Sequence, residues 1–158
     1  MEQNTPGLST VYLYLTNHCN LNCRHCWINP AYTNHNKQKG MELKLLVDIL
    51  EQCRELGMRS LKITGGEPLL YDSLMNFLEY LKLKKNAWNL FLNLETNGTM
   101  LDKKIAKALK ESGIKYVSVS IDGDNPDTHD RIRGMKGSFQ KAWRAVKDIV
   151  EESLFSIA

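Results

Sequence analysis

Residues 19–26 read Cys-Asn-Leu-Asn-Cys-Arg-His-Cys, and they follow an apolar segment, residues 11–15, that is typical of a strand. The three cysteines, spaced C-x3-C-x2-C, suit a metal site that takes three protein ligands and keeps one position open. A 4Fe–4S cluster meets this description, because each of its four irons takes one ligand and three cysteines leave one iron free. Zinc, with His18 or His25 as the fourth ligand, is the alternative, although structural zinc sites usually pair two C-x2-C knuckles from separate segments.

Outward from this loop, strand-like segments alternate with helix-like segments. The strands are expected at about Val11–Thr16, Ser60–Thr64, Asn89–Leu94 and Tyr116–Ile121. Apolar residues at helical spacing predict helices at about Glu42–Leu56, Asp72–Lys84, Asp102–Ser112 and Ser138–Glu151. This alternation predicts βαβ units with right-handed crossovers and a parallel sheet, and residues 153–158 could begin a fifth strand.

The residues best suited to bind a ligand or take part in a reaction come at the ends of the predicted strands. The cysteine loop follows the first strand, and the next three strands lead into Gly65-Gly66-Glu67-Pro68, Glu95-Thr96-Asn97-Gly98 and Ser120-Ile121-Asp122-Gly123. The C-terminal ends of parallel strands meet at one face of a sheet or barrel, and ligands bind at that face. The sequence therefore predicts that these four segments converge on one site.

Two of these segments together resemble the radical S-adenosylmethionine (radical SAM) superfamily. That family has its cluster cysteines at this spacing and a Gly-Gly-Glu element after its second barrel strand, which matches residues 65–67. The resemblance extends from about Thr10 to about Val150 and implies an α/β fold. We expect a partial (β/α) TIM-like barrel with parallel strands, in which about four of the six expected βα units are present. Residues 1–158 would then form one radical SAM core domain, incomplete at the C-terminus, with residues 1–9 as an N-terminal extension.

The same resemblance implies two cofactors. Cys19, Cys23 and Cys26 would ligate a 4Fe–4S cluster, and the amino and carboxylate groups of S-adenosylmethionine would bind the fourth iron. The reduced cluster would cleave S-adenosylmethionine to methionine and a 5′-deoxyadenosyl radical, which abstracts hydrogen from a substrate. No side chain is assigned as a catalytic residue.

The family's motifs also indicate which residues contact S-adenosylmethionine. Gly65 and Gly66 would let the backbone approach the amino group, which Glu67 would help to hold. The other predicted cofactor-binding residues are His25 near the adenine, Asn97, Ser120, Asp122, and Arg133 for the carboxylate, with Arg131 as the alternate. Plainer roles stay open: a loop hydrogen bond for His25, a turn for Asp122, and a surface position for either arginine.

Residues 117–143 look like the subgroup whose members carry C-terminal SPASM or twitch domains and modify peptides or proteins. By this analogy alone we expect a peptide or protein substrate and an electron donor such as flavodoxin or ferredoxin. The alternatives are a small-molecule substrate and a non-catalytic module that binds a cluster or zinc. Because two barrel units and the family's fifth-strand adenine motif are missing, we favour a fragment over a split enzyme completed by a partner chain or a self-associating small form.

The composition is that of one ordinary globular domain, with 158 residues, 42% of them hydrophobic and 25% charged, and a formal charge of +3. No block of like charge indicates a nucleic-acid or membrane partner, and no apolar run approaches the ~20 residues of a membrane span. The polar first ten residues lack a secretory signal. The cysteine usage then suits a reducing cytoplasm. Cys53, the fourth cysteine, lies within a helical pattern and is expected to be a small core residue rather than a ligand.

Overall fold

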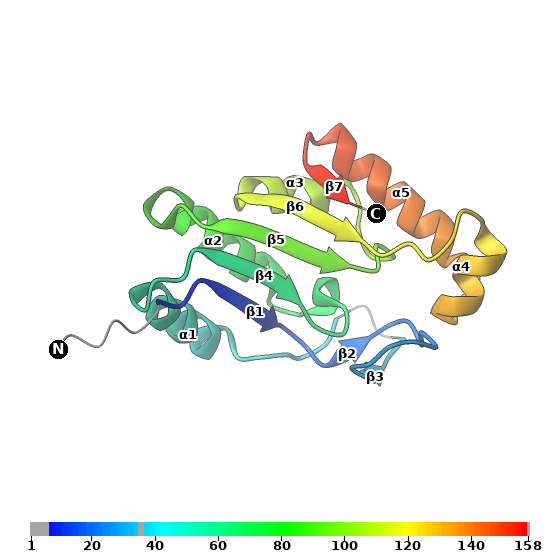
Figure 1. The fold of residues 1–158 in the computed structure, drawn as a ribbon, viewed down its shortest axis with the longest axis horizontal. Coiled ribbons are helices and arrows are strands. Elements are labelled where there is room, and N and C mark those ends of the chain that lie inside the picture. The colour runs from blue at the N-terminus through cyan, green and yellow to red at the C-terminus, as the bar shows by residue number, and fades with distance from the viewer. Residues whose placement is uncertain (1–6, 35–36, 158) are drawn as a thin grey trace.

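The main sheet of the protein is parallel throughout and has the strand order β1-β4-β5-β6-β7. In this computed structural model, which describes residues 7–34 and 37–157, the strands are β1 (Thr10–Tyr14), β4 (Ser60–Thr64), β5 (Phe91–Thr96), β6 (Ile114–Val119) and β7 (Phe155–Ile157). Neighbours in this sheet are also successive in the chain, as in a barrel (Figure 1). The predicted parallel α/β partial barrel is confirmed, and β7 is the expected fifth strand. Residues 1–6 of the predicted N-terminal extension lie outside the described residues.

Four helices pack against one face of this sheet (Figure 1). They are α1 (Leu43–Glu55), α2 (Leu74–Trp88), α3 (Lys103–Glu111) and α5 (Ser138–Glu151). Their apolar residues and those of the strands form one continuous hydrophobic core. Burial of this surface is the main stabilising term, at roughly 25 cal/mol per Å² of apolar area removed from water. None of the helices in the described part of the chain is long and apolar enough to cross a membrane.

The opposite face of the sheet is open to solvent. The strand register places Tyr12, Lys62, Asn93 and Tyr116 in one row across four strands. Because side chains alternate along a strand, this row lies on the face away from the buried Leu13. Tyr12 is 60% exposed, and the Lys62 ammonium lies 5.4 Å from the centre of its ring. The face that would be the interior of a closed barrel is therefore accessible in the described part of the chain.

The predicted helix boundaries of α1, α3 and α5 hold to within one residue. By contrast, α2 continues to Trp88, four residues past its predicted end, and stops where Asn89 adopts a left-handed conformation with φ of 46°. The strands β5 and β6 are each displaced by two residues from the prediction, β5 toward the C-terminus and β6 toward the N-terminus. These shifts follow from packing, since strand ends are set by register with their neighbours.

A short helix, α4 (Pro126–Arg133), is absent from the sequence prediction. Its start has clear local causes: the Asn125 side chain accepts a hydrogen bond from the N–H of Thr128 at 3.0 Å, and proline occupies the first helical position. Gly134 ends it in a left-handed conformation with φ of 70°. This helix matters for the site because Arg133 is its last residue.

Two loops at the C-terminal end of the sheet dock on each other through their backbones. After β1 the chain forms a small parallel pair, β2 (His18–Cys19) with β3 (Ala31–Tyr32), and after β4 it enters the short helix η1 (Pro68–Leu70). The N–H of Gly66 donates to the carbonyl of Thr16 at 2.9 Å. A Cβ atom at Gly66 would lie 2.3 Å from the carbonyl oxygen of His18, so only glycine allows this approach.

Replacing Gly66 by alanine should therefore push the cysteine loop away from the turn after β4. We expect Gly66→Ala to lower the free energy of unfolding by about 1–3 kcal/mol, the usual range for overpacking. Chemical denaturation measures this. Gly7→Ala is the matched control, because a Cβ atom there would meet its nearest atom at an ordinary 3.5 Å. Equal stability of the two variants would contradict the backbone-docking account.

Candidate functional site

A cavity of about 240 Å³ lies at the C-terminal ends of the strands. It is lined by Cys19, Leu21, Cys23, His25, Cys26, Trp27, Ile28, Thr64, Gly65, Gly66, Glu95, Thr96, Asn97, Ser120 and Arg133. Every predicted site residue is in this lining except Glu67, Asp122 and the alternate Arg131, which is exposed. The four segments that follow the strands therefore meet, as their places in the sequence predict.

Hydrogen-bond donors point at the sulfurs of two of the three cysteines. The Cys19 sulfur accepts from the backbone N–H of Leu21 at 3.4 Å and from the Asn97 amide at 3.8 Å. The Cys23 sulfur accepts from Nη1 of Arg133, also at 3.8 Å. N–H donors favour the thiolate form, which is the form that binds metals.

Burial acts against these donors. It raises the pKa of the Cys19 thiol to about 11, and the hydrogen bonds from Leu21 and Asn97 only partly oppose the shift. Burial also raises the pKa of Cys23, and the Arg133 guanidinium beside that sulfur works in the opposite direction. Ligation would therefore release protons, since the ligand is the thiolate.

The arrangement of the thiols bears on which metal group fits. All three are free thiols. Within the described residues, no three histidine, cysteine, aspartate or glutamate side chains converge closely enough to hold a single metal ion. A zinc site needs four ligands within about 2.3 Å of one point, whereas a 4Fe–4S cluster takes each thiolate on a different iron. Three separate thiols in the lining of one cavity, two of them with N–H donors at their sulfurs, fit the cluster.

Glu67 is fully buried and its carboxylate faces the protein. Oε1 accepts hydrogen bonds from the N–H of Leu69 at 3.0 Å and from the hydroxyl of Thr96 at 2.6 Å, and Oε2 accepts from the N–H of Asn97 at 2.8 Å. Burial raises the pKa of Glu67, and these hydrogen bonds oppose the shift only in part. The residue was predicted to help hold the amino group of S-adenosylmethionine. The structure instead places its carboxylate outside the cavity lining, where it joins the loops after β4 and β5.

Asn97 is also engaged mainly by the protein. Its amide nitrogen donates to Asn20 at 2.9 Å as well as to the Cys19 sulfur, and its Oδ1 accepts from the N–H and hydroxyl of Thr99. Thr99 in turn accepts from the Asn20 amide at 2.8 Å. This closed set of bonds orients the cysteine loop, which gives Asn97 a positioning role beside its predicted contact with S-adenosylmethionine or substrate.

Asp122 lies behind the cavity and pairs with two residues that line it. Its Oδ2 is 2.5 Å from Nε of Arg133, and its Oδ1 is 4.0 Å from Nε2 of His25. Neither Oδ2 nor Nε makes a hydrogen bond of normal geometry with any described residue, although both atoms are buried. The two atoms face each other in the ion pair, so Asp122 already neutralises this edge of the guanidinium. Arg133 also lines the cavity, where its contact with the carboxylate of S-adenosylmethionine stays a prediction. Ser120 lines the same wall and its N–H donates to Thr96.

Sequence reasoning missed several residues that shape the site. Asn20, Thr96 and Thr99 bind Glu67 or Asn97, as described above. Glu95 lines the cavity at the end of β5 and forms an ion pair with Lys62 on the open sheet face, at 2.5 Å. Its position two residues before Asn97, at the end of a predicted strand, was the available signal.

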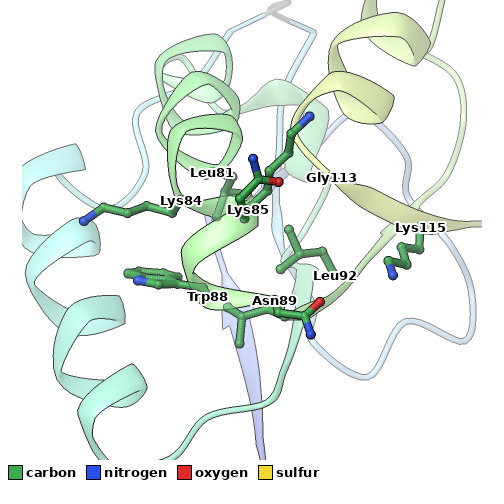
Figure 2. A pocket seen from close by; sticks show the side chains of 10 residues that line it. Leu81, Lys84, Lys85, Trp88, Asn89, Leu92, Gly113 and Lys115 are labelled. Carbon is green, nitrogen blue, oxygen red and sulfur yellow. The ribbon is translucent and has the colours of Figure 1, made fainter.

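A second cavity, of about 200 Å³, lies at the other end of the sheet, beyond the C-terminus of α2 (Figure 2). Leu81 and Leu92 form its floor, and three lysines lie around it. Two of these are already engaged: Lys84 pairs with Glu51 at 2.6 Å, and Lys85 donates to a backbone carbonyl of α3. Because two of its three lysines are engaged inside the protein and none of the cysteines lines it, this cavity is assigned no role.

Comparison with known proteins bears directly on the first cavity. The model of the radical SAM superfamily matches residues 13–156, nearly the whole chain. The chain belongs to the radical SAM superfamily. This membership confirms the predicted enzyme family and both predicted cofactors, the 4Fe–4S cluster and S-adenosylmethionine.

Among curated proteins, the radical SAM chain is 36% identical over 141 residues to the Fe-coproporphyrin III synthase of Methanosarcina barkeri, covering 89% of this chain and 33% of the relative. It is 33% identical over 150 residues to the GTP 3′,8-cyclase of Petrotoga mobilis, covering 94% of this chain and 45% of the relative. The chain therefore spans a third to about half of the length of these relatives.

Among solved structures, anSMEcpe with bound AdoMet superposes with a TM-score of 0.73 at 28% identity, over 96% of this chain and 42% of that one. SuiB of Streptococcus suis, bound to its precursor peptide SuiA, superposes equally well, with a TM-score of 0.73 over 95% of this chain and 32% of that one. At 21% identity this second likeness concerns the fold alone.

The raised pKa of Cys19 predicts slow alkylation of that thiol. With a pKa of about 11, roughly one molecule in a thousand carries the thiolate at pH 8. We expect iodoacetamide to modify Cys23 and Cys26, which are less buried, before Cys19 in the metal-free protein. Peptide mass spectrometry at timed intervals measures the order. In urea all the cysteines should react alike, and a fast Cys19 in the folded chain would contradict the described burial.

The raised pKa of Glu67 predicts a pH dependence of stability. Between about pH 4.5 and the raised pKa, the native protein keeps a proton that the unfolded chain has lost, so its stability falls as the pH rises. Glu67→Gln cannot titrate and lacks this contribution. The free energy of unfolding of wild type minus that of Glu67→Gln should therefore decrease with rising pH, by at most ~1.4 kcal/mol per pH unit. Urea denaturation from pH 4.5 to 8 tests this, and a difference that grows with pH would contradict it.

Proposed function

We propose that Cys19, Cys23 and Cys26 bind a 4Fe–4S cluster in this chain and that the adjoining cavity binds S-adenosylmethionine for reductive cleavage. The observation that carries the proposal is the presence of three free thiols in the lining of one cavity, together with the Gly65-Gly66 turn and Arg133. When bound, the cluster supplies the electron that cleaves S-adenosylmethionine to methionine and a 5′-deoxyadenosyl radical.

The protein's own residues would bind and orient the two cofactors. The Gly65-Gly66 turn lines the cavity, and its backbone carbonyl groups are the proposed acceptors for the ligand amine. Arg133 lines the cavity, and its guanidinium is the proposed partner of the ligand carboxylate. His25 and Ser120, on the same wall, are the proposed contacts to the adenosine portion. Asp122 would act through Arg133 and His25.

We propose two alternative classes of substrate. A peptide or protein substrate follows from the resemblance to the SPASM/twitch subgroup, and the shared fold with peptide-bound SuiB is compatible with it. A small-molecule substrate is favoured by the higher identity to Fe-coproporphyrin III synthase and GTP 3′,8-cyclase. The open sheet face, reached from the cavity past Glu95, is where we propose that either would lie. Which class accelerates release of 5′-deoxyadenosine separates the two.

Three further proposals concern the setting of the enzyme. An electron donor such as flavodoxin or ferredoxin would reduce the cluster. The free thiols suit a reducing compartment, for which we propose the cytoplasm. Further barrel units, from the same chain or from a partner chain, would cover the open face of the sheet. The 158-residue chain would then act as the core domain of a larger enzyme.

Anaerobic reconstitution with iron and sulfide tests the proposed function. We expect a reduced 4Fe–4S signal in electron paramagnetic resonance that shifts when S-adenosylmethionine is added, because one iron is left for the ligand. Replacing Cys19, Cys23 or Cys26 by alanine should abolish the signal. Cys53→Ala is the matched control and should retain it, since Cys53 packs against the core at a distance from the cavity. Tightly bound zinc without a cluster would overturn the proposal.

A further inference from the structure

Cys23 differs from the other two cysteines in having a cation beside its sulfur. Nη1 of Arg133 lies 3.8 Å from Sγ of Cys23. The donors at Cys19 are uncharged, a backbone N–H and an amide, and within the described residues no hydrogen bond reaches the sulfur of Cys26. The three sulfurs are therefore electrostatically inequivalent.

The position of this cation is fixed by the backbone on both sides. Arg133 is the last residue of α4, and the carbonyl of Ile132 accepts a hydrogen bond from the N–H of Arg24 in the cysteine loop at 2.9 Å. A Cβ atom at Gly134 would lie 2.5 Å from the carbonyl oxygen of Asn22, so the end of α4 presses directly on the loop between Cys19 and Cys23. The contact between guanidinium and sulfur thus belongs to the packing of α4 on the cluster loop.

Asp122 places an opposite charge on the far side of the same guanidinium. The ion pair between its Oδ2 and Nε of Arg133 leaves Nη1 directed toward the sulfur. Both side chains are shielded, with exposures of 10% for Arg133 and 21% for Asp122. His129 also lies here and accepts the N–H of Asp122, but burial lowers its pKa, so it adds no charge at neutral pH. Charges sheltered in this way are weakly screened and act over several ångströms.

Reduction adds one negative charge to the cluster and its sulfurs. A guanidinium that donates to a ligand sulfur stabilises that charge and raises the reduction potential, and a carboxylate next to the guanidinium lowers it again. We propose that Arg133 and Asp122 form a charge pair that sets the reduction potential of the cluster through Cys23, with Arg133 raising it and Asp122 limiting the rise. This inference rests on the proposed function, because it requires that the cysteines bind the cluster.

The role differs from the predicted contact of Arg133 with S-adenosylmethionine, since it operates when no S-adenosylmethionine is bound. A guanidinium that served only the ligand carboxylate would leave the potential of the ligand-free protein unchanged. The two charges of the pair also act with opposite signs, which a general loss of structure would not produce. Arg133 and Asp122 thus act on the cluster through their charges, Arg133 directly at the Cys23 sulfur and Asp122 through Arg133.

The test is a potentiometric titration of the reconstituted chain, followed by electron paramagnetic resonance, without S-adenosylmethionine. We expect Arg133→Gln to shift the midpoint to a more negative potential and Asp122→Asn to shift it to a more positive one. Arg133→Lys, which keeps the charge, should remain closer to wild type than Arg133→Gln. Arg131→Gln is the matched control, because it removes the same charge from an exposed position of the same helix.

The outcomes separate this inference from the proposed function. A wild-type cluster with unchanged midpoints in Arg133→Gln and Asp122→Asn would overturn the inference and leave the proposed function standing. Shifts of the same sign in both variants, or an equal shift in Arg131→Gln, would also overturn it. If Arg133→Gln fails to hold a cluster, the Asp122→Asn variant alone tests the inference. A shift of its midpoint to a more positive potential supports the inference, and no shift or a negative one overturns it. A wild-type chain that binds no cluster would overturn the proposed function and this inference with it.

Discussion

The buried carboxylate of Glu67 is the constraint on which the arrangement of the site depends. It accepts three hydrogen bonds, from Leu69 in its own turn and from Thr96 and Asn97 at the end of β5. The backbone N–H of Glu67 donates to the carbonyl of His18, so one residue joins the loops after β1, β4 and β5. A buried carboxylate is tolerated only where donors satisfy it, and the loops are therefore held in the one arrangement that supplies those donors.

The cysteine loop is also held by α4, which brings a positively charged side chain to it. Glu67 and Asn97 anchor the loop near Cys19 with neutral donors, whereas Arg133 approaches it near Cys23 with a guanidinium. The glycines at these contacts have a common reason, since two backbones meet where a Cβ atom would not fit. Because the thiols are oriented by the protein itself, little reordering would be needed when the cofactors bind.

The fold gives the sheet one face covered by helices and one open face. All the long helices bury one face of the sheet, so the core lies there, and the other face keeps a row of aromatic and charged residues in contact with solvent. The cavity sits where that open face meets the C-terminal ends of the strands. A chain that spans a third to about half of its relatives thus contains the proposed cofactor site, and the face where we propose that substrate lies is partly uncovered.

The sequence by itself determined the order of strands and helices through local periodicity, and the meeting of four loops at one face through the geometry of parallel strands. The spacing of the three cysteines was enough to predict them as the metal-binding residues. The sequence also contains the signals for α4, namely the cap Asn125, Pro126 at the first helical position and Gly134 at the end. Only the tertiary structure decided that Glu67 faces the protein, that Asn97 is part of a closed hydrogen-bond network and that Arg133 lies between Asp122 and the Cys23 sulfur. Each of these depends on which way a side chain turns once distant segments have packed, and that choice is set by the donors, acceptors and space that the other segments supply.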